Sequence, residues 1–247
     1  MWQECGRETL YKRIKLKIYI NKKPVTGPWG GGNKFVAALA NYLTEKKYNI
    51  TYNLTPDVDI IFCFDPRPNH ERLWYQNFID HKNKYKSKII QRVGDIGTHS
   101  KPELNQLVKL SSKYSDFLIF PSKWSKEKIQ YDKNNYSVIH NAPLSIFFNH
   151  DTKNKKCETL KIVTHHWSMN EKKGYDYYEY LGKNIKEKNI KNVEFTFIGR
   201  DNKNYAYAGI KLIDPIDAPG LSKELPKYDA YLTASLEEAG ANHVLEA

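Results

Sequence analysis

Two glutamates near the end of the chain have the chemistry to bind sugar hydroxyls. The segment YDAYLTASLEEAGANHVLEA (228–247) predicts a strand, a loop that holds Glu238 and Gly240, and then a helix capped by Asn242. Seven residues separate Glu238 from Glu246, which places Glu246 in the first turn of that helix. Both carboxylates can therefore reach one cleft and accept hydrogen bonds from a sugar and a ribose. Glutamate pairs at this spacing are common, so other residues must support the interpretation.

A lysine that could compensate a diphosphate follows an expected strand. In THHWSMNEKKGYDYY (164–178), His165 and His166 come at the end of the strand, and Lys173 and Gly174 begin a helix. Ligands of open α/β sheets bind at the carboxyl ends of the strands, and a lysine supplies a point charge on a flexible stem. The alternatives are a solvated helix start for Lys173 and packing or hydrogen-bonding roles for the histidines.

A glycine-rich segment provides a third candidate binding feature. Gly30, Gly31 and Gly32 permit positive φ and close backbone approach, and a helix is expected to start near Asn33. The N-terminus of that helix would present N–H groups to a phosphate-sized anion. The segment matches neither the dinucleotide fingerprint nor the P-loop. A flexible turn without a ligand is the alternative.

Alternating strands and helices are expected to position these residues. Apolar residues at every second position predict a strand over 14–20, and Phe35, Val36 and Leu39 begin a helical pattern after the glycines. Short segments that are apolar on both sides predict further strands, covered by helices on both faces. In the first half we expect strands near 48–54, 58–64, 88–93, 117–121 and 137–140, with helices near 69–84, 102–114 and 123–131.

The same alternation restarts after a polar stretch at 149–158, and we place the domain boundary in 142–158. The prediction is an α/β protein with two Rossmann-like, doubly wound parallel-sheet domains, an N-terminal one over 1–145 and a C-terminal one over 146–247. The sequence stops about one turn into a new helix, so the second domain is expected to be incomplete. Its expected strands are 160–166, 193–199, 211–216 and 230–235, with helices near 173–187 and 221–228.

Composition limits the possible function classes. The three cysteines, Cys5, Cys63 and Cys157, are widely spaced, which argues against a disulfide framework or a zinc cluster and favours a cytoplasmic setting. No secretory signal and no run of 18 uncharged apolar residues occurs, so any membrane contact is expected to be peripheral. The whole net charge of +11 lies in residues 1–145. Such a basic surface attracts nucleic acid, anionic lipid or phosphorylated substrates.

Taken together, these features resemble glycosyltransferase family 4 (group 1) of the GT-B class. The final segment is similar to that family's motif of two glutamates separated by seven residues. The similarities follow the family's order over residues 16–247, and each is weak alone. They comprise the glycine loop, FPSKWSKE (120–127), VIHNAP (138–143), Lys173-Gly174, and Ser235, Glu238, Gly240, Glu246 and Ala247 of the final motif.

The resemblance implies an acceptor-side first domain and a second domain for a nucleotide-sugar donor. By this analogy Gly31 and Gly32 approach the diphosphate and Lys173 compensates its charge, while Glu238 holds the sugar and Glu246 the ribose. The implied reaction is transfer from a UDP- or GDP-linked sugar to a glycan or lipid-linked acceptor in cell-envelope glycan biosynthesis. Retention at the anomeric carbon, without a metal or other cofactor, is expected.

The sequence departs from the family pattern at two places. Where the family commonly has an arginine six residues before the lysine, this chain has Trp167, and His165, His166 or Arg200 are the candidates for the missing charge. The family's first-domain histidine aligns best with Asp95 or His99, which we expect near the reacting centre. The alternative for Asp95 and His99 is loop capping or orientation of Lys101.

Other readings of the sequence are kept as alternatives. Asp57-Val58-Asp59 could be a metal-binding pair, but it begins a strand instead of ending one. No Gly-x-Ser-x-Gly elbow supports a hydrolase. A non-catalytic sugar-nucleotide module or a nucleic-acid binder is the runner-up, although the 18 tyrosines are scattered, which makes nucleic acid the weaker choice. The basic first domain also suggests peripheral contact with anionic membrane at the inner face.

Overall fold

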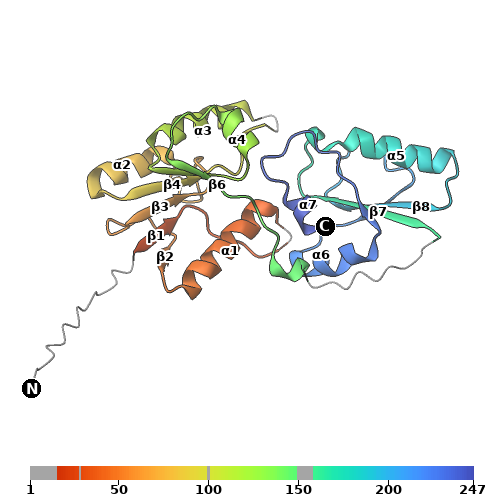
Figure 1. Cartoon of the computed structure of the whole chain (residues 1–247), viewed down its shortest axis with the longest axis horizontal. Coiled ribbons are helices and arrows are strands. Elements are labelled where there is room, and N and C mark those ends of the chain that lie inside the picture. The colour runs from red at the N-terminus through yellow and green to blue at the C-terminus, as the bar shows by residue number, and fades with distance from the viewer. Residues whose placement is uncertain (1–15, 28, 99–100, 149–157) are drawn as a thin grey trace, which may run out of the picture.

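The computed structural model describes residues 16–27, 29–98, 101–148 and 158–247, which form two parallel sheets with helices around them (Figure 1). We call β1–β6 with α1–α4 the first lobe, and β7–β10 with the helices that follow β7 the second lobe. Strands and helices alternate along most of both lobes, except that β2 is followed directly by β3 and β8 directly by β9. The α/β class and the two parallel sheets expected from the sequence are therefore confirmed.

The first sheet has six strands in the order β2-β1-β3-β4-β5-β6, and all its pairs are parallel. This order reverses direction at β1, as in doubly wound sheets, where ligands bind beyond the strand ends. Its strands are β1 (Lys17–Ile20), β2 (Asn49–Thr51), β3 (Ile60–Cys63), β4 (Lys88–Arg92), β5 (Phe117–Phe120) and β6 (Tyr136–Val138). Its helices are α1 (Gly31–Glu45), α2 (Tyr75–Tyr85), α3 (Pro102–Tyr114) and α4 (Lys123–Ile129).

The alternation in β1 explains why helices cover both faces of this sheet. Ile18 and Ile20 pack with Val36 of α1 on one face. Tyr19, which lies between them, packs with Phe78 of α2 on the other face. Successive strand side chains point to opposite faces, so an apolar strand needs two covering layers.

The second sheet has four parallel strands in the order β10-β7-β8-β9. Tyr175 and Tyr178 of α5 pack on Phe197 of β8, and Leu221 of α6 packs on the opposite face. The strands are β7 (Leu160–His166), β8 (Val193–Gly199), β9 (Ile210–Ile213) and β10 (Ala230–Tyr231). The helices are η2 (Glu171–Lys173), α5 (Tyr175–Glu187), α6 (Ala218–Glu224), η3 (Leu225–Lys227) and α7 (Asn242–Glu246).

Several element boundaries differ from the sequence-based expectation. Gly31 and Gly32 do not lie in a loop, because they form the first turn of α1. Helix α2 starts at Tyr75 because the side chain of Asn69 accepts hydrogen bonds from the N–H groups of Glu71 and Leu73 and holds that stretch in a turn. Strand β10 is limited to Ala230–Tyr231.

The segment between the sheets leads from one lobe onto the other. The 3-10 helix η1 (Ser145–Phe147) follows β6, and Phe147 packs against the core around α6. The exact boundary between the domains stays a prediction. None of the described helices combines the length and the apolarity that a bilayer crossing requires.

Candidate active site between the two sheets

A cavity of about 390 Å³ lies between the two lobes. Its volume is within the range of small-molecule binding sites. We call its lining residues numbered below 145 the first wall and those above 160 the second wall. The first wall includes Gly31 and Lys34 at the start of α1, Phe64 directly after β3, Arg92 at the end of β4, and Asp95 shortly after it. The second wall includes His165, Lys173, Glu238, His243 and Glu246.

An ion pair between Lys173 and Glu238 is the central feature of the second wall. The ammonium of Lys173 binds Glu238 Oε1, and Lys173 is only 8% exposed. Gly174 lies directly behind the lysine at φ +81°, where an added Cβ would stand 2.3 Å from the carbonyl oxygen of Ala234. Glycine is therefore required for η2 to approach the end of β10 and bring the two charges together.

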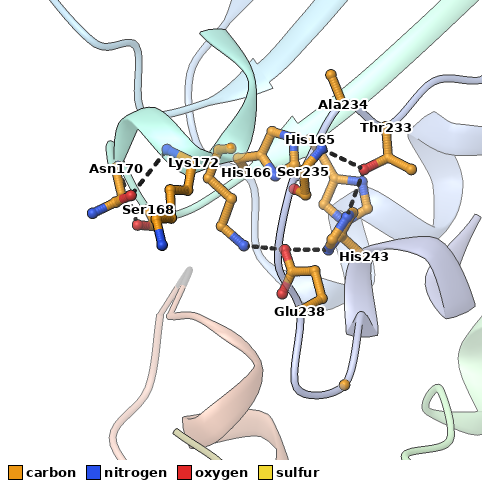
Figure 2. A network of polar contacts seen from close by, with 12 residues as sticks. His165, His166, Ser168, Asn170, Lys172, Thr233, Ala234, Ser235, Glu238 and His243 are labelled. Carbon is orange, nitrogen blue, oxygen red and sulfur yellow. Dashed lines mark hydrogen bonds and ion pairs between the residues drawn. The ribbon is translucent and has the colours of Figure 1, made fainter. Parts of the chain in front are cut away.

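A chain of polar contacts continues from Glu238 into the second lobe (Figure 2). His243 Nδ1 lies 3.9 Å from Glu238 Oε1, and His243 Nε2 lies 3.1 Å from the hydroxyl of Thr233. Burial lowers the pKa of His243 to about 4, although the charge of Glu238 opposes that shift. His243 is therefore neutral near pH 7.

His166 is a second buried histidine in the lining of the cavity. Its Nε2 lies 2.8 Å from the hydroxyl of Tyr178, which accepts a hydrogen bond from the N–H of Ala234. Burial, followed by the charges of His243 and Lys173, lowers the pKa of His166 well below its ordinary value. This histidine therefore supplies no positive charge at neutral pH.

Glu246 joins the two walls. Its Oε1 accepts a hydrogen bond from Lys34 of α1 at 2.8 Å, and its Oε2 lies 3.1 Å from His165 Nε2. Burial opposes ionisation of Glu246, but His165 and Lys34 outweigh that effect and lower its pKa. The expected proximity of Glu238 and Glu246 to one cleft is observed, and both carboxylates already have cationic or histidine partners.

Two buried polar atoms near these contacts have no hydrogen-bond partner among the described residues, His165 Nδ1 and Ser235 Oγ. Figure 2 shows both residues beside the Glu238 network. Unsatisfied buried polar atoms are few in native proteins, and they concentrate at functional sites.

The glycines at the start of α1 let another helix approach closely, and none of them has a positive φ. An added Cβ on Gly31 would lie 2.0 Å from Asn242 Nδ2 of α7. Gly30 is the N-cap, and its φ is −64°. Among the described residues, the N–H groups of Gly31 and Gly32 have no acceptor, as is usual in the first turn of a helix.

The remaining residues predicted from the sequence lie in different places. Asp95 lines the first wall, where it accepts hydrogen bonds from the Gly97 N–H at 3.0 Å and from Lys101 at 2.9 Å. These contacts favour loop capping and orientation of Lys101 over catalysis. His99 lies outside the described residues. Arg200 does not line the cavity, and its guanidinium lies 5.2 Å from the ring of Trp167.

Several charged or titratable residues of the cavity were not predicted from the sequence, among them Lys22, Lys34, Arg92 and His243. A signal existed for Arg92, because it is the last residue of an apolar strand and strand ends carry ligand sites. His243 lies inside the final motif segment, between the two glutamates. Nothing local marks Lys34 as a partner of Glu246, since 212 positions separate them.

The fold was compared with known proteins. No protein-family model matches the sequence, and a search of curated proteins finds no match. Among solved structures, WaaG, a glycosyltransferase involved in lipopolysaccharide biosynthesis, matches with a TM-score of 0.61 at 13% identity, over 94% of this chain and 78% of WaaG. The chain has the GT-B fold.

Two further structures of this fold are similar. S. aureus TarM, solved with fondaparinux, α-GlcNAc-glycerol and UDP, matches with a TM-score of 0.54 at 14% identity, over 86% of this chain. Anabaena HepE in complex with UDP-glucose matches with a TM-score of 0.51 at 12% identity, over 83% of this chain and 70% of HepE. The chain spans only 42% of the length of TarM.

Proposed function

We propose that this GT-B chain is a glycosyltransferase that binds a nucleoside-diphosphate sugar in the cavity and transfers the sugar to an acceptor. The observation that carries the proposal is the ion pair between the buried Lys173 and the partly buried Glu238, at the carboxyl edge of the second sheet and facing a cavity of about 390 Å³. A cation and a carboxylate that can separate around a ligand match the two ends of such a donor, its diphosphate and its sugar.

Donor binding would exchange the contacts that the cavity residues make with one another. The diphosphate takes the Lys173 ammonium from Glu238, and the released carboxylate then accepts hydrogen bonds from sugar hydroxyls. The unpaired N–H groups of Gly31 and Gly32 complete the diphosphate site. Glu246 accepts hydrogen bonds from the ribose, since its low pKa keeps it ionised.

The chemical step follows from these positions. As the bond between the sugar and the diphosphate breaks, negative charge builds on the leaving oxygens and the sugar becomes oxocarbenium-like. The Lys173 charge and the α1 amides stabilise that leaving group, which lowers the barrier directly. From the family resemblance we propose retention at the anomeric carbon and no requirement for a metal.

The similar structures suggest which partners to test first. TarM is described with UDP and HepE with UDP-glucose, so UDP is the first nucleotide to test and GDP the second. WaaG is described as acting in lipopolysaccharide biosynthesis, in keeping with a glycan or lipid-linked acceptor. We propose a cytoplasmic enzyme that works on such an acceptor at the inner face of the membrane.

Calorimetric titration of UDP, GDP and their sugars tests the donor site. Lys173→Met should weaken binding of the preferred nucleotide by roughly tenfold to a hundredfold, because a charge-assisted contact to the diphosphate is lost. Lys172→Met is the matched control: the adjacent lysine pairs with Glu237 at 3.0 Å and does not line the cavity.

The outcomes separate the possible functions. Nucleotide binding that both variants weaken equally would contradict the Lys173 site. No binding of UDP or GDP by the wild-type chain would contradict the proposed function. Saturable donor binding without sugar transfer or hydrolysis would support the non-catalytic binding module instead.

A further inference from the structure

Arg92 is a buried cation on the first wall whose role is not explained by donor binding. It ends β4, is 6% exposed, and lines the cavity. Its guanidinium carbon lies 4.0 Å from the centre of the Phe35 ring and 5.6 Å from that of Phe64. Phe35 packs against the guanidinium and Phe64 lies beside Phe35, with 5.9 Å between the two ring centres, so both rings limit where the planar group can lie.

The charge of Arg92 has no carboxylate partner among the described residues. The nearby carboxylates are engaged elsewhere: Asp65 binds Arg67 at 2.6 Å, and Asp95 binds Lys101 at 2.9 Å. One hydrogen bond is formed, from Nη2 to Asn141 Oδ1 at 2.7 Å. Burial lowers the pKa of Arg92 to about 10, so the group is still protonated at neutral pH.

The local backbone is built to accommodate this guanidinium. An added Cβ on Gly94 would lie 2.1 Å from Arg92 Nη1, so the glycine lets the side chain lie across the loop. Asn141, which accepts from Arg92, also donates to the carbonyl of Gly240 at 3.2 Å. The guanidinium is therefore fixed relative to the loop that carries Glu238.

A second cation lies close by. Lys22 lines the same wall, its ammonium is 5.2 Å from the centre of the Phe64 ring, and it has no carboxylate partner among the described residues. Lys34 and Lys173, in contrast, are paired with glutamates. Both Lys22 and Arg92, which have no carboxylate partner among the described residues, therefore lie within 6 Å of the centre of the Phe64 ring.

We propose that Arg92 and Lys22 form a phosphate-binding subsite for the acceptor, so that the enzyme glycosylates a phosphorylated molecule. This inference rests on the proposed function, because it takes the first wall as the acceptor side. A buried charge without a partner is unfavourable and is expected where a ligand supplies the counter-charge. Two cations match the charge of a phosphate better than that of a carboxylate, and the guanidinium fork binds phosphate oxygens in pairs.

Calorimetry on the full chain, saturated with UDP to fill the donor site, tests the subsite. The probes are glucose 6-phosphate, glucuronate and glucose, which share one sugar scaffold. We expect binding of glucose 6-phosphate only, weakened by roughly tenfold to a hundredfold in Arg92→Met, while UDP affinity changes less than about twofold. Arg72→Met, an exposed arginine outside the cavity, removes the same charge and should have no effect.

Each outcome decides the proposal. The proposed acceptor subsite is contradicted if UDP binds but glucose 6-phosphate does not. It is also contradicted if Arg92→Met leaves the affinity for glucose 6-phosphate unchanged. If Arg92→Met weakens UDP instead, the cation belongs to the donor diphosphate. Tighter binding of glucuronate than of glucose 6-phosphate would show that the subsite binds a carboxylate and not a phosphate, which contradicts the proposal. Failure of UDP to bind the wild type would contradict the proposed function itself.

A second variant separates the position of the charge from its presence. Gly94→Ala keeps Arg92 but forces its guanidinium to move, and it should also weaken glucose 6-phosphate with no change in UDP affinity. Thermal unfolding checks both proteins. Arg92→Met should melt no lower than the wild type without ligand, and a large loss would show that Arg92 is a structural residue.

Discussion

Arg92 of the first wall and Lys173 of the second wall hold their positive charges in different ways. On the second wall, Lys173 is neutralised by Glu238, and ligand binding must first separate that pair. On the first wall, Arg92 contacts Phe35, Phe64 and Asn141, and none of the carboxylates in the described part of the chain pairs with it. Arg92 is therefore preorganised for an anion, whereas Lys173 has to exchange one counter-charge for another.

The largest expected effect concerns the glycine that positions the second-wall lysine. Gly174→Ala should destabilise the protein by about 3–5 kcal/mol, since the residue has φ +81° and its Cβ would meet the Ala234 carbonyl at 2.3 Å. Chemical denaturation measures the loss. In the control Gly27→Ala, φ is +118° but the nearest atom is a flexible side chain at 3.4 Å, so the expected loss is about 1–2 kcal/mol.

The second prediction contrasts Lys173 with Arg92. Lys173→Met should cost about 2–3 kcal/mol of unfolding free energy, because it leaves the largely buried Glu238 without its cation. The double variant Lys173→Met/Glu238→Gln should recover most of that loss. Arg92→Met leaves no carboxylate of the described residues without its cation, so it should cause no loss of unfolding free energy. Equal losses in the two single variants would contradict the difference between Lys173 and Arg92.

The third prediction is a pH dependence that belongs to the second wall. The folded pKa of His243, about 4, lies below its unfolded value near 6.5, so its contribution to stability is present above pH 6.5 and is lost as the pH falls toward 4. Between pH 7 and pH 5 this loss is about 2 kcal/mol. His166 acts in the same direction.

Denaturation at the two pH values, compared between wild type and His243→Gln, measures the contribution of His243. The variant should lose less stability between pH 7 and pH 5 than the wild type does. An identical pH dependence in the two proteins would show that His243 is not the group that titrates.

The smallest expected effect concerns the contact between the walls. Lys34→Met removes the 2.8 Å ion pair to Glu246, but His165 still binds that carboxylate, so the expected loss is about 1 kcal/mol. Lys46→Met on the exposed end of the same helix is the control. Small-angle scattering should detect a slightly larger radius of gyration only in Lys34→Met. No difference between the two variants would mean that the Lys34–Glu246 ion pair does not hold the lobes together.

Much of the architecture was predictable from local pattern. The strand expected over 160–166 is β7, and the helix expected over 102–114 is α3, with the same bounds. Short apolar segments can be buried on both faces only between two layers of helices, which identified parallel sheets. Bounds were less accurate where side chains rather than periodicity stop an element, as at Asn69 before α2.

The candidate site was only partly predictable. The sequence alone identified Lys173, Glu238, Glu246, His165 and the glycines as residues at strand ends and helix starts, since those positions follow from local spacing. It did not identify which charges neutralise one another. Lys173 binds Glu238, and Lys34 binds Glu246 across 212 positions, because side-chain contacts depend on how the loops and lobes pack.

The sequence by itself determined the alternating elements, and with them the parallel sheets and the edge at which ligands bind. Only the tertiary structure decided which of the two buried cations is paired. Lys173 has Glu238 as its partner, whereas Arg92 has no carboxylate partner among the residues that the structure describes. The physical reason is range: helix and strand patterns come from neighbours a few positions apart, whereas the balance of charge in a cavity depends on every element that lines it.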